Sequence, residues 1–179
     1  MAEVDPFLVQ IRDIADFPKP GVVFKDITPL LADRDGLQAC VTDLASAGRD
    51  ADGQVVVDKV MGLEARGFIL GAAVALTLGV GFIPGRKQGK LPHDTHAIDY
   101  DLEYGQETLE LHVDAIRPGE RVLIIDDVLA TGGTARAAIE LVQRCGGVVH
   151  ALSVLMELTF LNGRAAIGDI PLRVAHTVS

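Results

Sequence analysis

The sequence predicts an α/β fold built on a central, mostly parallel sheet flanked by helices. Strand and helix patterns alternate along the chain. The β-branched run 54–60 precedes the apolar stretch 68–78, and the branched apolar run 122–125 precedes the helical spacing of 135–144. Polar turns follow both strands, and ligands bind such sheets at the carboxyl ends of the strands. The same pattern therefore predicts both the fold class and the position of a ligand site.

The composition is that of one soluble domain. The chain has 179 residues, 49% of them hydrophobic, which is enough for one buried core and too few for two ordinary domains, so we expect a single domain over 1–179. The net charge of −9 argues against a nucleic-acid surface, and the apolar stretch 68–83 is too short for a membrane span. The acidic start lacks the basic region of a secretory signal, which predicts a cytoplasmic protein.

The first third of the chain has the pattern of two helices separated by a proline-rich connection. Residues 4–14 have the apolar spacing of a helix, and the prolines in 17–21 end helical geometry. Residues 35–48 have the pattern of a second, amphipathic helix. The strand 54–60 then runs into the polar turn 62–67, which is the first of the two candidate ligand turns.

The remaining elements continue the alternation around one long polar segment. The buried helix 68–78 leads to a strand at 80–83, and residues 85–105 follow, rich in charge, glycine and histidine. That segment is too long and polar for an ordinary connection, which predicts a mobile lid that can carry strands at its edges. The pattern then predicts a strand at 109–113 and a last strong strand at 148–156.

The segment 122–134 carries the most specific signal. Its buried strand ends in two adjacent carboxylates, Asp126 and Asp127, and a glycine–threonine turn leads into the next helix. Backbone N–H groups of that turn can converge on a monophosphate at the positive end of the helix, whereas ionised carboxylates suit sugar hydroxyl groups. The alternative, a solvated strand end and an N-capped turn, explains each piece separately. The whole predicts a phosphorylated sugar, its phosphate held by Ala130, Thr131, Gly132, Gly133 and Thr134.

This segment resembles the phosphoribosyl diphosphate (PRPP) motif of the type I phosphoribosyltransferases. The resemblance implies that family's fold, with a small N-terminal hood over residues 1–34 and a flexible lid over residues 85–105. It also implies that Asp126 and Asp127 hold the ribose hydroxyl groups and stabilise a cationic sugar centre. The glycine–threonine turn would hold the 5-phosphate.

A transferase that uses PRPP also needs groups that neutralise the departing diphosphate. Arg66, in the turn 63–67 at a helix start, is the best single candidate, because one guanidinium engages two oxygens at once. The lid adds Arg86, Lys87 and Lys90, whose alternative role is that of a solvated charge cluster. Magnesium is expected to bind through the diphosphate oxygens, with no direct metal ligand from the protein.

Further runs, taken in order and spacing, resemble the adenine phosphoribosyltransferases within that family. These runs are 17–27, 62–68, 86–92, 100–105 and 157–159. The resemblance implies transfer of the 5-phosphoribosyl group from PRPP to adenine, giving AMP and diphosphate in purine salvage. It also implies a homodimer in which Arg86 or Lys87 reaches the neighbouring site.

The same resemblance implies a base pocket made by Val23, Phe24, Lys25 and Leu158. Phe24 and Leu158 would sandwich the purine, while backbone groups of Val23 and Lys25 read its edge. A donor and an acceptor of fixed direction distinguish a 6-amino from a 6-oxo purine. The family often has arginine where this chain has Lys25, a difference that matters if the arginine fork takes part in recognition.

For the proton on adenine N9, the resemblance implies Glu103 as the general base and Tyr104 as a residue that positions the lid. A lid carboxylate can equally serve to order the closed lid. Two other functions fit the PRPP motif: a transferase for hypoxanthine, guanine or xanthine, and a non-catalytic regulator that senses PRPP. The proline-rich run and the segment 157–159 favour adenine, and the acidic balance argues against a regulator that binds nucleic acid.

Overall fold

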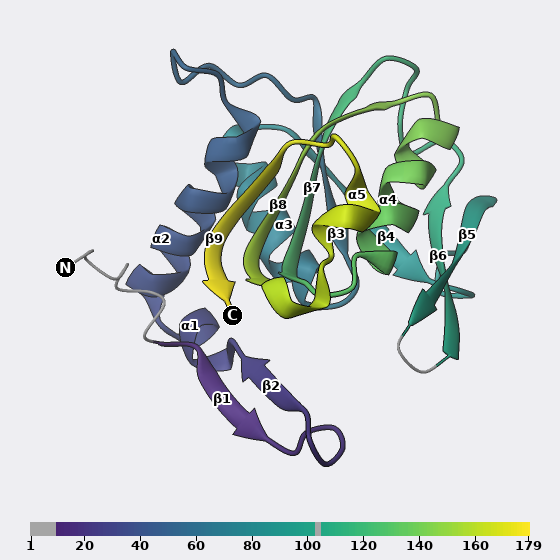
Figure 1. Cartoon of the computed structure of the whole chain (residues 1–179). Helices are drawn as coiled ribbons and strands as arrows, with labels where there is room; N and C mark the ends of the chain where they lie inside the picture. Colours follow the sequence, from purple (N-terminus) through teal and green to yellow (C-terminus); the bar gives the residue numbers. More distant parts are fainter. Residues whose placement is uncertain (1–9, 103–104) are drawn as a thin grey trace. The chain divides into compact units, whose positions relative to one another are not determined.

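A computed structural model describes residues 10–102 and 105–179 of the chain (Figure 1). The chain forms two compact units, residues 1–42 and residues 43–179. The smaller unit contains a two-stranded antiparallel sheet, and the larger one contains a seven-stranded sheet. Within the described ranges, no helix is both long and apolar enough to cross a membrane.

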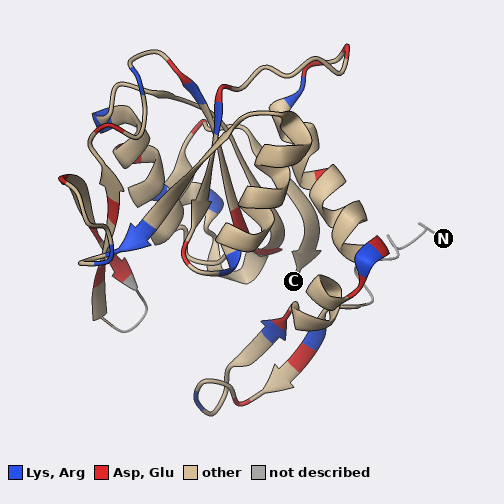
Figure 2. Cartoon of the chain, turned by 180° about the vertical axis from the view of Figure 1, so that it is seen from behind, with Lys and Arg blue, Asp and Glu red and all other residues tan. Residues whose placement is uncertain are grey.

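The smaller unit is built on a β-hairpin. Strands β1 (Arg12–Ala15) and β2 (Val23–Asp26) pair antiparallel, and they are followed by α1 (Thr28–Ala32) and the start of α2 (Arg34–Ala45). Opposite charges face each other across the hairpin, where Arg12 pairs with Asp26 and Asp13 with Lys25 (Figure 2). The helix expected over 4–14 is therefore wrong for its last residues, because pairing with β2 overrides a short helical spacing.

The larger unit has a mostly parallel sheet with the strand order β5-β6-β4-β3-β7-β8-β9. The five strands from β4 to β9 in that order are parallel, whereas β4–β6 and β5–β6 are antiparallel. The strands are β3 (Lys59–Leu63), β4 (Gly81–Lys87), β5 (Thr95–Leu102), β6 (Gly105–His112), β7 (Arg121–Leu129), β8 (Val148–Leu158) and β9 (Leu172–Val178).

Helices cover both faces of this sheet (Figure 1). Helix α3 (Arg66–Leu78) packs on β3 and β7, and α4 (Gly133–Arg144) packs on the opposite face. Successive side chains of a strand point to opposite faces, so the continuous apolar run of β7 places apolar side chains on both faces of the sheet. Its Val122 and Ile124 belong to the buried cluster that contains Leu141 of α4. The shorter helices are η2 (Ser46–Gly48), η3 (Thr159–Leu161) and α5 (Arg164–Ile167).

Two strands differ from the sequence expectation. Strand β3 begins at Lys59 rather than at residue 54, because Val55 forms an isolated bridge with Arg49 and the Val56 N–H donates to the Gly48 oxygen, outside the seven-stranded sheet. Strand β9 follows the strand expected to be the last, and it pairs parallel with β8 at the sheet edge. Half-buried and exposed residues do not alternate regularly along its seven residues, so the sequence pattern gives no clear strand signal there.

Strands make up much of the segment expected to be a lid. The residues 85–87 end β4, and β5 pairs antiparallel with β6 along eight register positions from Thr95↔His112 to Leu102↔Gly105. This hairpin extends the sheet beyond β4. The strands expected at the edges of the segment are therefore present, and its mobility stays a prediction.

Candidate active site

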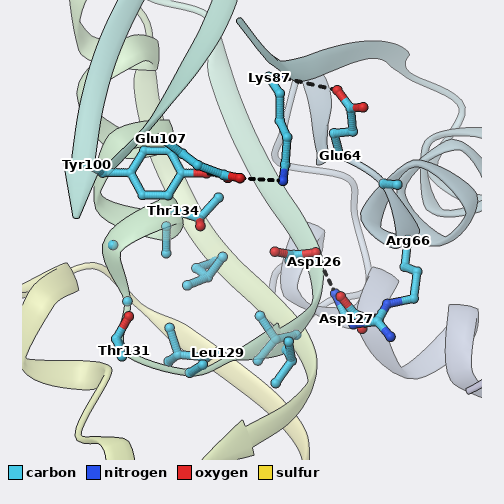
Figure 3. A pocket seen from close by; sticks show the side chains of 18 residues that line it. Glu64, Arg66, Lys87, Tyr100, Glu107, Asp126, Asp127, Leu129, Thr131 and Thr134 are labelled. Carbon is cyan, nitrogen blue, oxygen red and sulfur yellow. Dashed lines mark hydrogen bonds and ion pairs between the residues drawn. The ribbon is translucent and has the colours of Figure 1, made fainter. Parts of the chain in front are cut away.

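A cavity of about 360 Å³ lies at the carboxyl ends of β3 and β7 (Figure 3). Both polar turns singled out in the sequence open onto it, as the topology of a parallel sheet requires. Among its lining residues are Glu64, Arg66, Lys87, Tyr100, Glu107, Asp126, Asp127 and the whole stretch 128–135. The larger unit alone therefore brings together the carboxylates, the glycine–threonine turn and Arg66.

The two adjacent carboxylates are held by their own backbone and by one arginine. The backbone N–H of Asp127 donates to Oδ1 of Asp126 at 2.9 Å, and Nε of Arg66 forms an ion pair with Oδ2 of Asp127 at 2.7 Å. The side chain of Asp127 is only 5% exposed. A side chain at Gly67 would come within 2.9 Å of Asp126 Oδ1, so glycine is needed where α3 passes this strand end.

Burial changes the titration of this carboxylate pair. It raises the pKa of Asp126 well above 3.8, and the neighbouring charge of Asp127 raises it further. Burial also raises the pKa of Asp127, against the opposing effect of Arg66. Negative charge on this pair is therefore costly to keep, and sugar hydroxyl groups would relieve that cost by donating hydrogen bonds.

We expect Asp126→Asn to stabilise the fold at neutral pH while impairing function. Between pH 3.8 and the raised pKa, the folded protein keeps a proton that the unfolded chain loses, so stability falls as the pH rises through this window. Asparagine removes that penalty and can still accept the hydrogen bond from Asp127 N–H. Thermal unfolding should show a Tm higher by about 2–4 °C at pH 7. A lower Tm for the variant at pH 7 would contradict the assignment.

The glycine–threonine turn is shaped by close backbone contacts. Gly132 has φ 84°, and a Cβ on it would lie 2.5 Å from the backbone oxygen of Gly163. A Cβ on Gly133 would lie 2.8 Å from the backbone oxygen of Asp101. Helix α4 begins at Gly133, so its first backbone N–H groups lack partners within the helix. The turn therefore has, at a helix N-terminus, the geometry that the predicted phosphate seat requires, and its role as that seat stays a prediction.

Three linked side chains, from β4, β5 and β6, form one wall of the cavity (Figure 3). The Tyr100 hydroxyl donates to Oε2 of Glu107 at 2.9 Å, and Nζ of Lys87 pairs with Oε1 of the same carboxylate at 2.8 Å. Burial raises the pKa of Tyr100 to about 12, so the phenol keeps its proton. The Lys87 hydrogen bond, with that of Tyr100 and against burial, lowers the pKa of Glu107.

The carboxylate of Glu64 binds groups of all three lid cations, Arg86, Lys87 and Lys90. Its Oε2 accepts the backbone N–H of Lys87 at 3.0 Å and faces Nε of Arg86 at 3.3 Å, while Oε1 pairs with Nζ of Lys90. Burial raises the pKa of Glu64, but the hydrogen bonds from Lys90, Lys87 and Arg86 outweigh it and lower the pKa overall. Of the three lid cations, Arg86, Lys87 and Lys90, the structure places Lys87 in the cavity wall and pairs the other two with Glu64.

Sequence reasoning did not assign Glu64, Tyr100 or Glu107 to the site. Glu64 was visible only as a charge two residues before Arg66. Tyr100 and Glu107 face each other across the β5–β6 ladder, so their pairing appears only once the hairpin register is known. Register depends on long-range pairing rather than on local pattern.

The remaining predicted residues lie in different parts of the chain. Val23, Phe24 and Lys25 are on β2 of the smaller unit, where Phe24 meets Phe17 edge-to-face at 5.1 Å and Nζ of Lys25 pairs with Asp13 at 2.7 Å. Leu158 ends β8 in the larger unit. Their grouping into a base pocket stays a prediction. Glu103 and Tyr104 lie outside the described residues.

The donor set of the cavity fits a magnesium ion carried by a polyphosphate. Among the described residues, no cluster of three or more histidine, cysteine or acidic side chains could hold a metal ion. The carboxylates of Asp126 and Asp127 are assigned to the ribose hydroxyl groups, so phosphate oxygens and water, which usually supply most of the magnesium shell, would hold the ion.

A family model described as the phosphoribosyl transferase domain matches residues 33–158. With the parallel sheet, the carboxylate pair and the anion seat, this match defines the class: a phosphoribosyltransferase of the type I fold, which confirms the predicted fold.

Individual relatives narrow the class. An adenine phosphoribosyltransferase from a Nocardioides species is 63% identical over 171 residues, which cover 96% of this chain and 92% of the relative. The crystal structure of the enzyme from Thermoanaerobacter pseudethanolicus is 44% identical with a TM-score of 0.91, covering 98% and 100% of the two chains. That of the Saccharomyces cerevisiae enzyme, complexed with an imino-altritol bisphosphate and adenine, is 36% identical with a TM-score of 0.89, covering 94% and 96%. The chain belongs to the adenine phosphoribosyltransferase family.

Proposed function

We propose that this protein transfers the 5-phosphoribosyl group of PRPP to adenine, giving AMP and diphosphate in purine salvage. Family membership supports the reaction. The observation that carries it is the meeting, in one cavity, of a buried carboxylate pair, a glycine–threonine anion seat and Arg66. A sugar phosphate with a second anionic group is the ligand that this set complements.

Each part of PRPP has a matching group in the cavity. The backbone N–H groups of the turn from Ala130 to Thr134 hold the 5-phosphate, and Asp126 and Asp127 accept hydrogen bonds from the ribose hydroxyl groups. Arg66, at the start of α3, engages the diphosphate beside them. The same two carboxylates stabilise the positive charge that develops on the sugar as the diphosphate leaves.

The lid cations and magnesium serve the leaving group. Lys87 lines the cavity, and Arg86 and Lys90 pair with Glu64, which also lines it. Magnesium enters with PRPP and, when bound, offsets the negative charge of the diphosphate. Tyr104 positions the lid over the substrate, and closure excludes water from the cationic sugar centre.

Adenine recognition is assigned to Val23, Phe24, Lys25 and Leu158, as the family resemblance implies. Phe24 and Leu158 sandwich the purine, and the backbone groups of Val23 and Lys25 read its edge. The side chain of Lys25 is engaged by Asp13, with Nζ at 2.7 and 2.8 Å from the two carboxylate oxygens. This pairing supports a role for Lys25 through its backbone. Glu103 takes the N9 proton.

A homodimer is the assembly that the surface of α3 supports. The helix has no charged residue after Arg66, and its Ile69 and Leu76 are 49% and 83% exposed. The two positions are seven residues apart and share one helix face, which an apolar partner surface would cover. In that dimer Arg86 or Lys87 reaches the neighbouring site. A cytoplasmic location completes the proposal.

Product formation with a panel of bases tests the function. Adenine, hypoxanthine, guanine, xanthine and orotate are each supplied with PRPP and magnesium, and nucleotide and diphosphate are quantified by chromatography. We expect AMP from adenine and little product from the other bases. Product from another base would keep the PRPP chemistry and overturn the adenine pocket. Absence of product despite measurable PRPP binding would instead favour a PRPP-sensing regulator.

A further inference from the structure

The cations assigned to the diphosphate all pair with carboxylates of the chain itself. Arg66 pairs with Asp127, and Lys87 pairs with Glu107. The third carboxylate, Glu64, pairs with both Arg86 and Lys90. An incoming diphosphate therefore competes with charges that the chain itself supplies.

Two of these carboxylates have no assigned task in holding substrate. Glu64 and Glu107 line the cavity. The Glu64 side chain is 9% exposed, and that of Glu107 is partly buried at 32%. Their lowered pKa values mean that both are ionised at neutral pH, so they repel an anion in the cavity as well as neutralise the lid cations. This repulsion is less screened than between fully exposed charges, because both side chains are at least partly buried.

We propose that Glu64 and Glu107 are internal counter-anions of the diphosphate site, which hold the lid cations while the site is empty and reclaim them when diphosphate leaves. The proposal rests on the proposed function and adds a means of limiting product affinity. A cluster of four cations without such partners would bind diphosphate tightly and release it slowly, and release limits the turnover of many enzymes.

The geometry fits an exchange of partners. The Glu64 carboxylate accepts the backbone N–H of Lys87 at 3.0 Å. It also pairs with the side chains of Arg86 and Lys90. The lysine and arginine side chains can swing to a new anion while the backbone contact keeps Glu64 in place. Glu107 is likewise retained by the Tyr100 hydroxyl at 2.9 Å when Nζ of Lys87 moves away.

Neutral isosteres test the exchange. Glu64→Gln and Glu107→Gln remove one negative charge each and keep an oxygen that can accept from Lys87 N–H or Tyr100 OH. Titration calorimetry with magnesium diphosphate should show binding about tenfold tighter than wild type for each variant, as one unit charge near a half-buried anion implies. Steady-state assays should show a lower KM for PRPP together with a lower kcat.

Glu120→Gln is the matched control. Glu120 accepts the backbone N–H of Arg117 at 2.8 Å and pairs with Nζ of Lys59 at 3.0 Å, so it has the same kinds of partner as Glu64. It lies at the opposite end of β7 from the cavity. Its substitution should leave diphosphate affinity within about twofold of wild type.

The outcomes separate this inference from the proposed function. Formation of AMP by the wild-type protein tests the function in the same preparations. If AMP forms and both variants bind magnesium diphosphate no more tightly than wild type, the counter-anion role is overturned. If either variant folds and binds it more tightly while Glu120→Gln does not, the role is supported. Glu64 lies in the turn after β3 and Glu107 in β6, so the test stays decisive if one of the two variants fails to fold.

Discussion

Replacing both carboxylates of the pair, Asp126→Asn with Asp127→Asn, is expected to lower kcat/KM for PRPP by about 10³-fold. The amides retain the shape of the site and can still accept hydrogen bonds, but they remove the charge that binds ribose hydroxyl groups strongly. They also remove the negative potential next to the developing sugar cation. Steady-state kinetics with saturating adenine and varied PRPP would measure the loss.

The fold is expected to survive this change, because the buried pair costs stability at neutral pH. Asp114→Asn is the control, since Asp114 is an exposed carboxylate outside the cavity, and it should keep wild-type kcat/KM. If the double variant retained more than a tenth of the wild-type kcat/KM, the proposed role of the carboxylate pair in the reaction would be contradicted.

The second large effect is expected for Gly132→Ala in the anion seat. An alanine with φ 84° costs about 1 kcal/mol in backbone strain, and its Cβ would meet the backbone oxygen of Gly163 at 2.5 Å. The oxygen belongs to rigid backbone, so the turn must move and its N–H groups lose their convergence on the phosphate. We expect kcat/KM for PRPP to fall by about 10²-fold, mainly through a higher KM.

Gly119→Ala separates loop displacement from backbone strain. Gly119 has φ 85°, and a Cβ there would find nothing within 4 Å. The control therefore carries a similar strain cost without a clash, and it should lower the Tm while leaving kcat/KM unchanged. Equal kinetic losses in the two variants would mean that general destabilisation, and not the shape of the seat, explains the result.

Local pattern was enough to predict the centre of this site. The branched apolar run of β7 and the helical spacing of α4 differ in period, so the turn between them could be placed, and with it Asp126, Asp127 and the anion seat. Arg66 followed from the second strand–turn–helix unit. The strands of both strand–turn–helix motifs end at the same edge of a parallel sheet, which is why the two motifs meet at one cavity.

Long-range pairing determined what the pattern missed. The strand β1 forms where a helical spacing was expected, because its charged residues pair across the hairpin with β2. The contact between Tyr100 and Glu107 depends on the register of β5 and β6, and the role of Glu64 depends on where β4 ends. None of these contacts has a signature within a short window of sequence.

The most direct test of the account is a crystal structure of the protein with AMP. The account predicts phosphate oxygens on the backbone N–H groups of the turn from Thr131 to Thr134, ribose hydroxyl groups on Asp126 and Asp127, and adenine between Phe24 and Leu158. A phosphate bound elsewhere, with the carboxylate pair free of the ribose, would contradict it.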